Sequence, residues 1–209
     1  MTISYEGPIP NINYNTVQGW NSRVGISYNK WFDDNRVTFF TAKVNATYGV
    51  SDDRLRFDGL ITKRFNFKDK LTLTLEGGSK VTQFNSNEPI KPIINSISTL
   101  FFERNYMKVY ELNFVRFKYS QEIVNGIDIS VSTGFENRKP LFNTADWVMI
   151  PNSGVNYSSN NPLDPSDFEN AAIENHDVYK TEIKGNIVFG QKYFSFPGWL
   201  LPFASILYW

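Results

Sequence analysis

His176 is the single histidine of this 209-residue chain, and polar side chains surround it in the sequence. Asn175 and Asp177 flank it, and Ser158 and Ser159 precede it in the same polar segment. A serine hydrolase needs a serine, a histidine and an orienting Asp or Asn that converge in space. Because no nucleophile-elbow motif accompanies these residues, a histidine at the base of a loop is the favoured reading. We therefore predict no catalytic residue and no enzyme activity.

Acidic side chains gather in the same segment, at Asp164, Asp167, Glu169, Glu174 and Asp177. Oxygen-rich loops can bind Ca²⁺, which takes about 6–8 oxygen ligands. The spacing does not match an EF-hand, and a solvated acidic loop is the more common origin of such a run. We therefore predict no metal site and no cofactor site.

A third group combines charge with aromatic rings: Glu103, Arg104 and Lys108 stand beside Tyr106 and Tyr110. Such a group could contact a protein partner or a lipid headgroup. A charged rim where a strand begins would have the same composition, and it is the reading we favour.

The composition excludes several classes of protein. Lys and Arg number 21 and so do Asp and Glu, which argues against a nucleic-acid binder, since such proteins carry a basic excess. Cysteine is absent, which excludes disulfide scaffolds and thiol chemistry. No phosphate-binding glycine loop and no HExxH motif occur. Aromatic residues reach 16% while the mean hydropathy is only −0.35, a combination typical of alternating β-strands.

The clearest structural element is a hairpin over residues 110–138. Ile127, Ile129, Val131 and Phe135 share one parity and polar residues the other, so one face of this strand is apolar. An Asn-Gly pair at 125–126 predicts the tight turn before it. In the preceding run the apolar parity switches between residues 114 and 115, which predicts a β-bulge there.

Similar alternation predicts strands over residues 16–29, 37–50, 55–65, 70–83 and 176–189, and another that begins at residue 200. The tally is about eight long strands and a single domain, 1–209. Residues 94–102 fit a short helix or a strand equally well. Proline and asparagine before residue 15 argue against regular structure there. We expect long exposed loops near 84–106 and 139–176.

Two all-β architectures compete, a soluble sandwich and an antiparallel transmembrane β-barrel. Strands of about a dozen residues favour the barrel, because a tilted crossing of the bilayer takes about 9–11 residues. Short turns then lie on the periplasmic side and long loops outside. Charged residues of one parity would face inward and pair across the interior: Arg23, Lys43, Arg56, Arg64, Lys80, Arg116, Lys118, Lys180 and Lys184 with Asp58, Glu76, Asp128, Glu136 and Glu182.

Ordered motifs along the chain carry a resemblance. They are NTVQGWN at 15–21, YGVSD at 48–52, ERNYMKVYE at 103–111, NG at 125–126, RKPLFNT at 138–144 and GQKY at 190–193. Together they resemble a Bacteroidetes family of outer-membrane proteins whose members have a signal peptide, a carboxypeptidase-regulatory-like β-sandwich and a C-terminal barrel of unknown function. The resemblance implies a fragment of a larger barrel, since neither the leader nor the β-sandwich is recognisable here.

From these observations we expect a non-enzymatic protein of the bacterial outer membrane, a transport, assembly or accessory component of an outer-membrane complex. Its partners would be outer-membrane lipid and other outer-membrane or periplasmic proteins, with no nucleic acid and no small-molecule cofactor. The alternative is a soluble or surface-exposed all-β binding module that uses the long loops as its ligand face.

Overall fold

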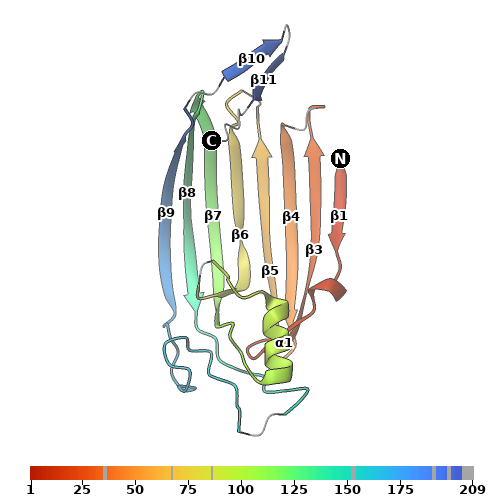
Figure 1. Cartoon of the computed structure of the whole chain (residues 1–209), viewed down its shortest axis with the longest axis vertical. Helices are drawn as coiled ribbons and strands as arrows, with labels where there is room; N and C mark the ends of the chain where they lie inside the picture. The colour runs from red at the N-terminus through yellow and green to blue at the C-terminus, as the bar shows by residue number, and fades with distance from the viewer. Residues whose placement is uncertain are drawn as a thin grey trace, which may run out of the picture.

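A computed structural model describes residues 1–34, 37–66, 68–85, 87–151, 154–189, 192–196 and 199–203. These residues fold into one large antiparallel sheet, a separate two-stranded sheet and one α-helix (Figure 1). The strands are β1 (Thr2–Glu6), β2 (Asn13–Asn15), β3 (Gly19–Trp31), β4 (Phe39–Gly49), β5 (Arg54–Arg64), β6 (Thr72–Gln83), β7 (Val109–Val124), β8 (Ile127–Lys139), β9 (His176–Ile187), β10 (Lys192–Phe196) and β11 (Trp199–Phe203). A 3₁₀ turn, η1 (Ile9–Asn11), and the helix α1 (Pro92–Phe102) complete the description.

The main sheet has nine strands in the order β1-β3-β4-β5-β6-β7-β8-β9, and β2 pairs with the start of β3. The predicted all-β antiparallel class is confirmed. The sheet is open, with β1 and β9 at its two edges. The short β1 was not predicted, because the prolines that follow it argued against regular structure in this segment. Its residues pair with the second half of β3. The strand expected from residue 200 begins at Trp199, and residues 204–209 lie outside the described part.

The hairpin of β7 and β8 turns at residues 125–126 as predicted, with Gly126 at a φ of 82°. The bulge predicted between Phe114 and Val115 is wrong, because the register runs unbroken there and shifts only near Val124. Leu112 lies on the same face as Arg116 but is buried at the end of the sheet. The apolar parity therefore switches because this face of β7 is buried at the end of the sheet and carries ion pairs further along the strand.

The sheet divides at Gly78, near one end. Pairing between β5 and β6 stops at Asp58 and Gly78, whereas β6 continues beside β7 as far as Gln83 and Val109. Gly78 has a φ of 136°, and a Cβ there would lie 2.2 Å from the carbonyl oxygen of Phe57. Only glycine fits this conformation and this approach, so Gly78 allows β6 to leave β5.

Two long connections and α1 gather at the end of the sheet where β6 leaves β5 (Figure 1). We call α1 with residues 84–108 and 140–175 the loop cap. The ambiguous segment at 94–102 is helical: Pro92 stands in its first turn, and Glu103 ends it in a left-handed conformation with a φ of 52°. Met107 and Val109 form a buried cluster with Val17.

The loops expected near 84–106 and 139–176 are exposed over much of their length, but each contains a buried stretch. Asn95, Thr99 and Asn160 in them are at most 5% exposed, because the connections pack on each other and on the β2–β3 turn. Trp147 packs against Tyr14 there, with ring centroids 6.1 Å apart. Residues such as Leu163 and Phe168 remain exposed at the outer part of the cap.

Candidate functional site: a two-faced sheet with a polar cap

The strand register assigns each side chain of the sheet to one of two faces. Ile61 pairs with Leu75, which pairs with Phe117, so these three share a face. Paired positions in adjacent strands always do so. We call this the apolar face. Its larger side chains include Ile26, Val44, Phe57, Ile61, Leu75, Val115, Phe117, Val131, Phe135, Tyr179 and Ile183.

The apolar face is largely uncovered. Val44 is 59% exposed, Phe57 54% and Ile183 72%. The buried hydrophobic side chains of the described residues all belong to the capped end instead: Tyr14, Val17, Leu100, Met107, Val109, Tyr110 and Leu112. Monomeric water-soluble proteins rarely expose apolar patches beyond a few hundred Å². This face therefore needs an apolar environment.

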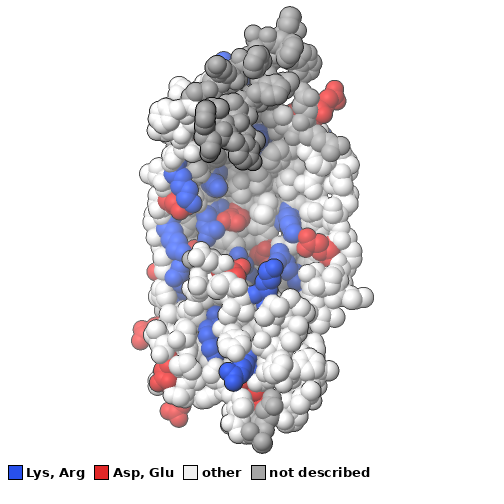
Figure 2. All heavy atoms as spheres, in the orientation of Figure 1, with Lys and Arg blue, Asp and Glu red and all other residues white. Residues whose placement is uncertain are grey.

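The opposite face carries ion pairs, and we call it the charged face. Arg116 lies 2.6 Å from Glu76 and 3.0 Å from Glu136. Glu136 also pairs with Arg138 at 2.7 Å and with Lys180 at 3.2 Å. Figure 2 shows Lys, Arg, Asp and Glu gathered over the middle of the face in view, between mostly white margins.

The charged residues that we predicted to share one face do lie on one face of the sheet. The strand register places Glu76, Arg116 and Lys180 in one row across it. Several of them form ion pairs, including Arg23 with Asp58 at 3.9 Å between strands and Lys184 with Glu182 at 2.9 Å along β9, while pairing across an enclosed interior stays a prediction. These pairs neutralise part of the charge on the face, where the cations of the set outnumber the carboxylates.

A polar network ties the loop cap to the sheet. Asn105 donates to the carbonyl of Ser158 at 2.7 Å and to the hydroxyl of Thr16 at 3.1 Å. Asn160 accepts from the backbone N–H of Val109 at 2.9 Å and donates back to its carbonyl at 2.7 Å. Asn160 thus replaces the strand partner that β7 lacks at its start, and Asn105 links the two parts of the cap to the β2–β3 turn.

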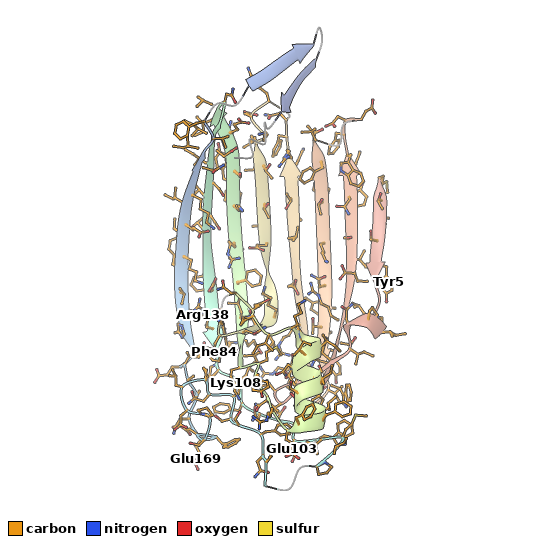
Figure 3. All side chains as sticks on the ribbon, in the orientation of Figure 1. Tyr5, Phe84, Glu103, Lys108, Arg138 and Glu169 are labelled. Carbon is orange, nitrogen blue, oxygen red and sulfur yellow. The ribbon has the colours of Figure 1, made fainter. Side chains whose placement is uncertain are left out.

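Lys108 lies within this network, just before β7 begins. Its amine donates to the Ser158 hydroxyl at 2.6 Å and to the Ser159 carbonyl at 2.5 Å. Burial lowers the pKa of Lys108 to about 8, because the charged ammonium loses solvation there. In Figure 3, Lys108 and Glu103 lie in the loop cap, and Phe84 and Arg138 lie where the strands meet it.

His176, the residue around which a catalytic triad would have to form, is the first residue of β9. Its Nδ1 lies 2.8 Å from the carbonyl oxygen of Glu174. The Ser158 hydroxyl instead donates to Asn105 at 2.8 Å, and the Ser159 hydroxyl donates to the carbonyl of Asp164 at 2.9 Å. In the described residues, no hydrogen bond joins either serine to the imidazole, so the geometry assembles no Ser–His pair.

The acidic segment organises its own backbone. Asp164 accepts from the N–H and the hydroxyl of Ser166, and Asp167 accepts from the N–H groups of Glu169 and Asn170. These hydrogen bonds lower the pKa of both carboxyls, since they stabilise the charged form. Within the described parts of the chain, no group of three or more His, Cys, Asp or Glu could hold a metal ion.

The group at residues 103–110 is dispersed by the fold. Glu103 is buried at the end of α1, whereas Tyr106 is 53% exposed. Tyr110 is buried against Phe84, with ring centroids 5.2 Å apart, and Arg138 lies over its ring at 5.5 Å. The group therefore forms neither a single partner site nor a continuous charged rim.

Sequence reasoning missed Asn105, Asn160 and Thr16, which hold the cap. The available signal was the Ser-Ser-Asn-Asn run at 158–161, which lies within the exposed loop that we expected near 139–176. An asparagine-rich run is compatible with an exposed turn and with a buried polar network, because the side-chain amide supplies both a donor and an acceptor in either setting. Its burial becomes visible only with the packing of distant segments.

Comparison with known proteins gives one match. A family described as "Family of unknown function (DUF5686) C-terminal domain" matches residues 1–204. No curated protein and no solved structure matches the chain. Among the described residues, no helix is long and apolar enough to cross a membrane.

Proposed function

The chain belongs to this family of unknown function, and from its two-faced sheet we propose that it forms part of a transmembrane β-barrel in the bacterial outer membrane. In this proposal it is non-enzymatic and acts as a transport, assembly or accessory component of an outer-membrane complex. Outer-membrane lipid covers the apolar face, and other outer-membrane or periplasmic proteins are its partners.

The apolar face is the observation that carries the proposal. It runs across the sheet from Ile26 in β3 to Ile183 in β9, and these side chains are 58% and 72% exposed. Burial of apolar surface is worth about 25 cal/mol per Å², so leaving such a face in water is costly. A bilayer removes that cost, whereas a soluble sandwich would need a second layer over the same residues.

The dimensions and the strand ends also fit a bilayer. Strands β3 to β9 have 11 to 16 residues, and a tilted crossing needs about 9–11. At the end with short turns, the Lys63 amine lies 4.7 Å from the Phe65 ring centroid and 5.9 Å from that of Phe32. Aromatic rings with lysines that reach past them are typical of a membrane interface.

The open edges support a larger assembly. The outer backbone groups of β1 and β9 need hydrogen-bond partners inside a bilayer, where water is absent. Further strands would supply these partners and close the sheet around the charged face. The ion pairs of Arg116 and Glu136 would then line a polar interior, as is common in outer-membrane barrels.

Single-cysteine labelling tests the proposal without background, because the chain has no cysteine. Val44→Cys places a polarity-sensitive fluorophore on the apolar face, and Lys43→Cys places it one residue away on the charged face. The two positions have the same depth along β4. After reconstitution into lipid vesicles, we expect the Val44 label to be blue-shifted and quenched by lipid-attached quenchers, and the Lys43 label to remain in water.

Equal quenching of both labels, or of neither, would contradict the membrane assignment. Extraction distinguishes the two proposals as well. A membrane barrel needs detergent to stay in solution, whereas a soluble binding module would stay in solution without detergent. That result together with an unquenched Val44 label would favour the module and its loop-borne ligand face.

A further inference from the structure

A polar cavity of about 400 Å³ lies where β6 leaves β5 at Gly78. One wall comes from the charged face of β3, β4 and β5, with Arg23, Thr47 and Asp58. The other wall is the end of β6, and residues of η1, β2 and the segment before α1 close the site. Its volume falls in the range of about 300–1,000 Å³ usual for small-ligand sites.

Gln18 contributes a buried donor without a partner. The side chain is part of the cavity lining and the residue is 4% exposed. Among the described residues, no hydrogen-bond acceptor meets its Nε2. A buried, unpaired amide nitrogen costs about 1–3 kcal/mol, so an acceptor from outside the chain would stabilise this site.

The orientation of the Gln18 amide is fixed by its neighbour. Asn15 Oδ1 accepts from the backbone N–H groups of Val17 and Gln18, at 3.0 and 2.7 Å. The Asn15 Nδ2 group must therefore point the other way, where it donates to Gln18 Oε1 at 3.2 Å. Since that contact takes the oxygen of Gln18, its two N–H donors are directed elsewhere.

The charges of the lining favour an anion. Arg23, Lys80 and Lys91 supply three cations, against the carboxylates of Asp58 and Glu88. Asp58 accepts from Asn45 at 2.7 Å and lies 3.9 Å from Arg23, and Glu88 accepts from Thr82 at 2.7 Å, so Lys80 and Lys91 supply the excess of positive charge. Among the described lining residues, the Nε of Arg23 is a second buried donor atom without an acceptor. Both unpartnered atoms are donors, so a ligand that presents acceptor oxygens would satisfy them.

We propose that this cavity binds an acidic saccharide of up to disaccharide size, whose carboxylate meets Gln18 and Arg23 and whose hydroxyl groups meet the remaining amide and carboxylate side chains. Asn13, Asn21 and Gln83 line the same cavity and supply further amides. Hydroxyl groups both donate and accept, which matches a lining of amides and carboxylates better than an apolar ligand would. This inference is independent of the membrane assignment.

Binding of digalacturonate to the purified protein, measured by isothermal titration calorimetry, tests the proposal. Cellobiose serves as the neutral disaccharide of similar size, and inorganic phosphate as an anion without a sugar. We expect digalacturonate to bind and the two comparison probes to bind at least about 10-fold more weakly, because a charge-assisted hydrogen bond is lost in one and the sugar contacts in the other.

Gln18→Glu is the matched variant, because glutamate has the same shape and its carboxylate still accepts from Asn15. It removes the donor and repels an anion, so we expect at least about a 10-fold loss of digalacturonate affinity. Lys118→Gln removes a positive charge from the same sheet face outside the cavity and should leave the affinity unchanged. Far-UV circular dichroism confirms that both variants fold.

Three results would overturn the proposal. The first is that no probe binds at millimolar concentration, which would leave the cavity to water. The second is equal affinity for cellobiose and digalacturonate, which removes the role of charge. The third is an equal loss in both variants, which would assign the effect to the overall charge of the face.

Discussion

Glu111 in β7 and Arg56 in β5 form an ion pair across the gap that opens at Gly78, with Oε2 and Nη2 3.0 Å apart. Arg56 reaches Asp52 as well, at 2.7 Å. Both partners of the pair are nearly buried, at 3% and 9% exposure of their side chains. The pair connects β5 to β7, the strand beyond β6, at the level where β5 and β6 no longer share backbone hydrogen bonds.

Removing Arg56 should therefore be costly. Arg56→Gln leaves Asp52 buried without its cation, while Glu111 keeps Arg54 at 2.9 Å, so we expect a loss of about 3 kcal/mol in the free energy of unfolding. Guanidinium unfolding followed by tryptophan fluorescence measures it. Lys184→Gln breaks an ion pair whose side chains are 69% and 60% exposed, and it should change stability by less than about 1 kcal/mol. A similar small change in both variants would contradict the bridging role of Arg56.

Gly78 makes a second prediction about the same gap. Gly78→Ala forces a Cβ to within 2.2 Å of the Phe57 carbonyl oxygen at a φ of 136°, so we expect a loss of at least about 2 kcal/mol. Gly185→Ala in β9 is the control, since nothing lies within 4 Å of the added Cβ there. Chemical unfolding of both variants distinguishes them. Equal stability would show that β6 does not need glycine to leave β5.

Lys108 predicts a pH dependence of stability. Its pKa falls from 10.5 to about 8 on folding, so between these values the unfolded chain binds the proton more strongly than the folded one. Stability should therefore rise as the pH is raised from about 8 towards 10, because the folded chain has released the proton that the unfolded chain still binds. The denaturant midpoint of the wild type, measured at about pH 7.5 and about pH 9.5, tests this rise, because the two pH values lie on either side of the folded pKa of Lys108.

Lys108→Met is the comparison for that experiment, because it removes the titrating amine and keeps most of the apolar stem. We expect a smaller rise of the midpoint between the two pH values than in the wild type. An identical rise in the variant would assign the pH dependence to other groups.

The sheet could be predicted from the sequence because the alternation of apolar and polar residues within each strand shows which side chains share a face. Ile129 and Val131 alternate with Ser130 and Ser132, and period-two alternation fixes both the strand and its apolar side. The Asn-Gly turn at 125–126 then fixes the partner. The charges of the opposite parity, such as Arg116 and Glu136, followed from the same alternation.

The loop cap and the cavity could not be predicted in this way. Asn160 meets Val109, and Asn105 meets Thr16, across 51 and 89 residues of chain. Such contacts depend on how distant segments pack, and no local periodicity encodes them. Gly78 shows the same limit: in the sequence it is one of two adjacent glycines in a strand, and only its position beside Phe57 reveals the split.

The membrane assignment predicts an asymmetry between the two faces under substitution with lysine. Val44 is 59% exposed at the middle of β4, so in a water-soluble protein Val44→Lys should be nearly neutral. In a bilayer the same change places a charge in hydrocarbon, at a cost of about 2–4 kcal/mol near the midplane. Ser132→Lys is the control, since Ser132 pairs with Lys118 on the charged face. Unfolding of both variants in lipid vesicles should show the loss for Val44→Lys alone, and equal stability of the two would contradict the burial of the apolar face in lipid.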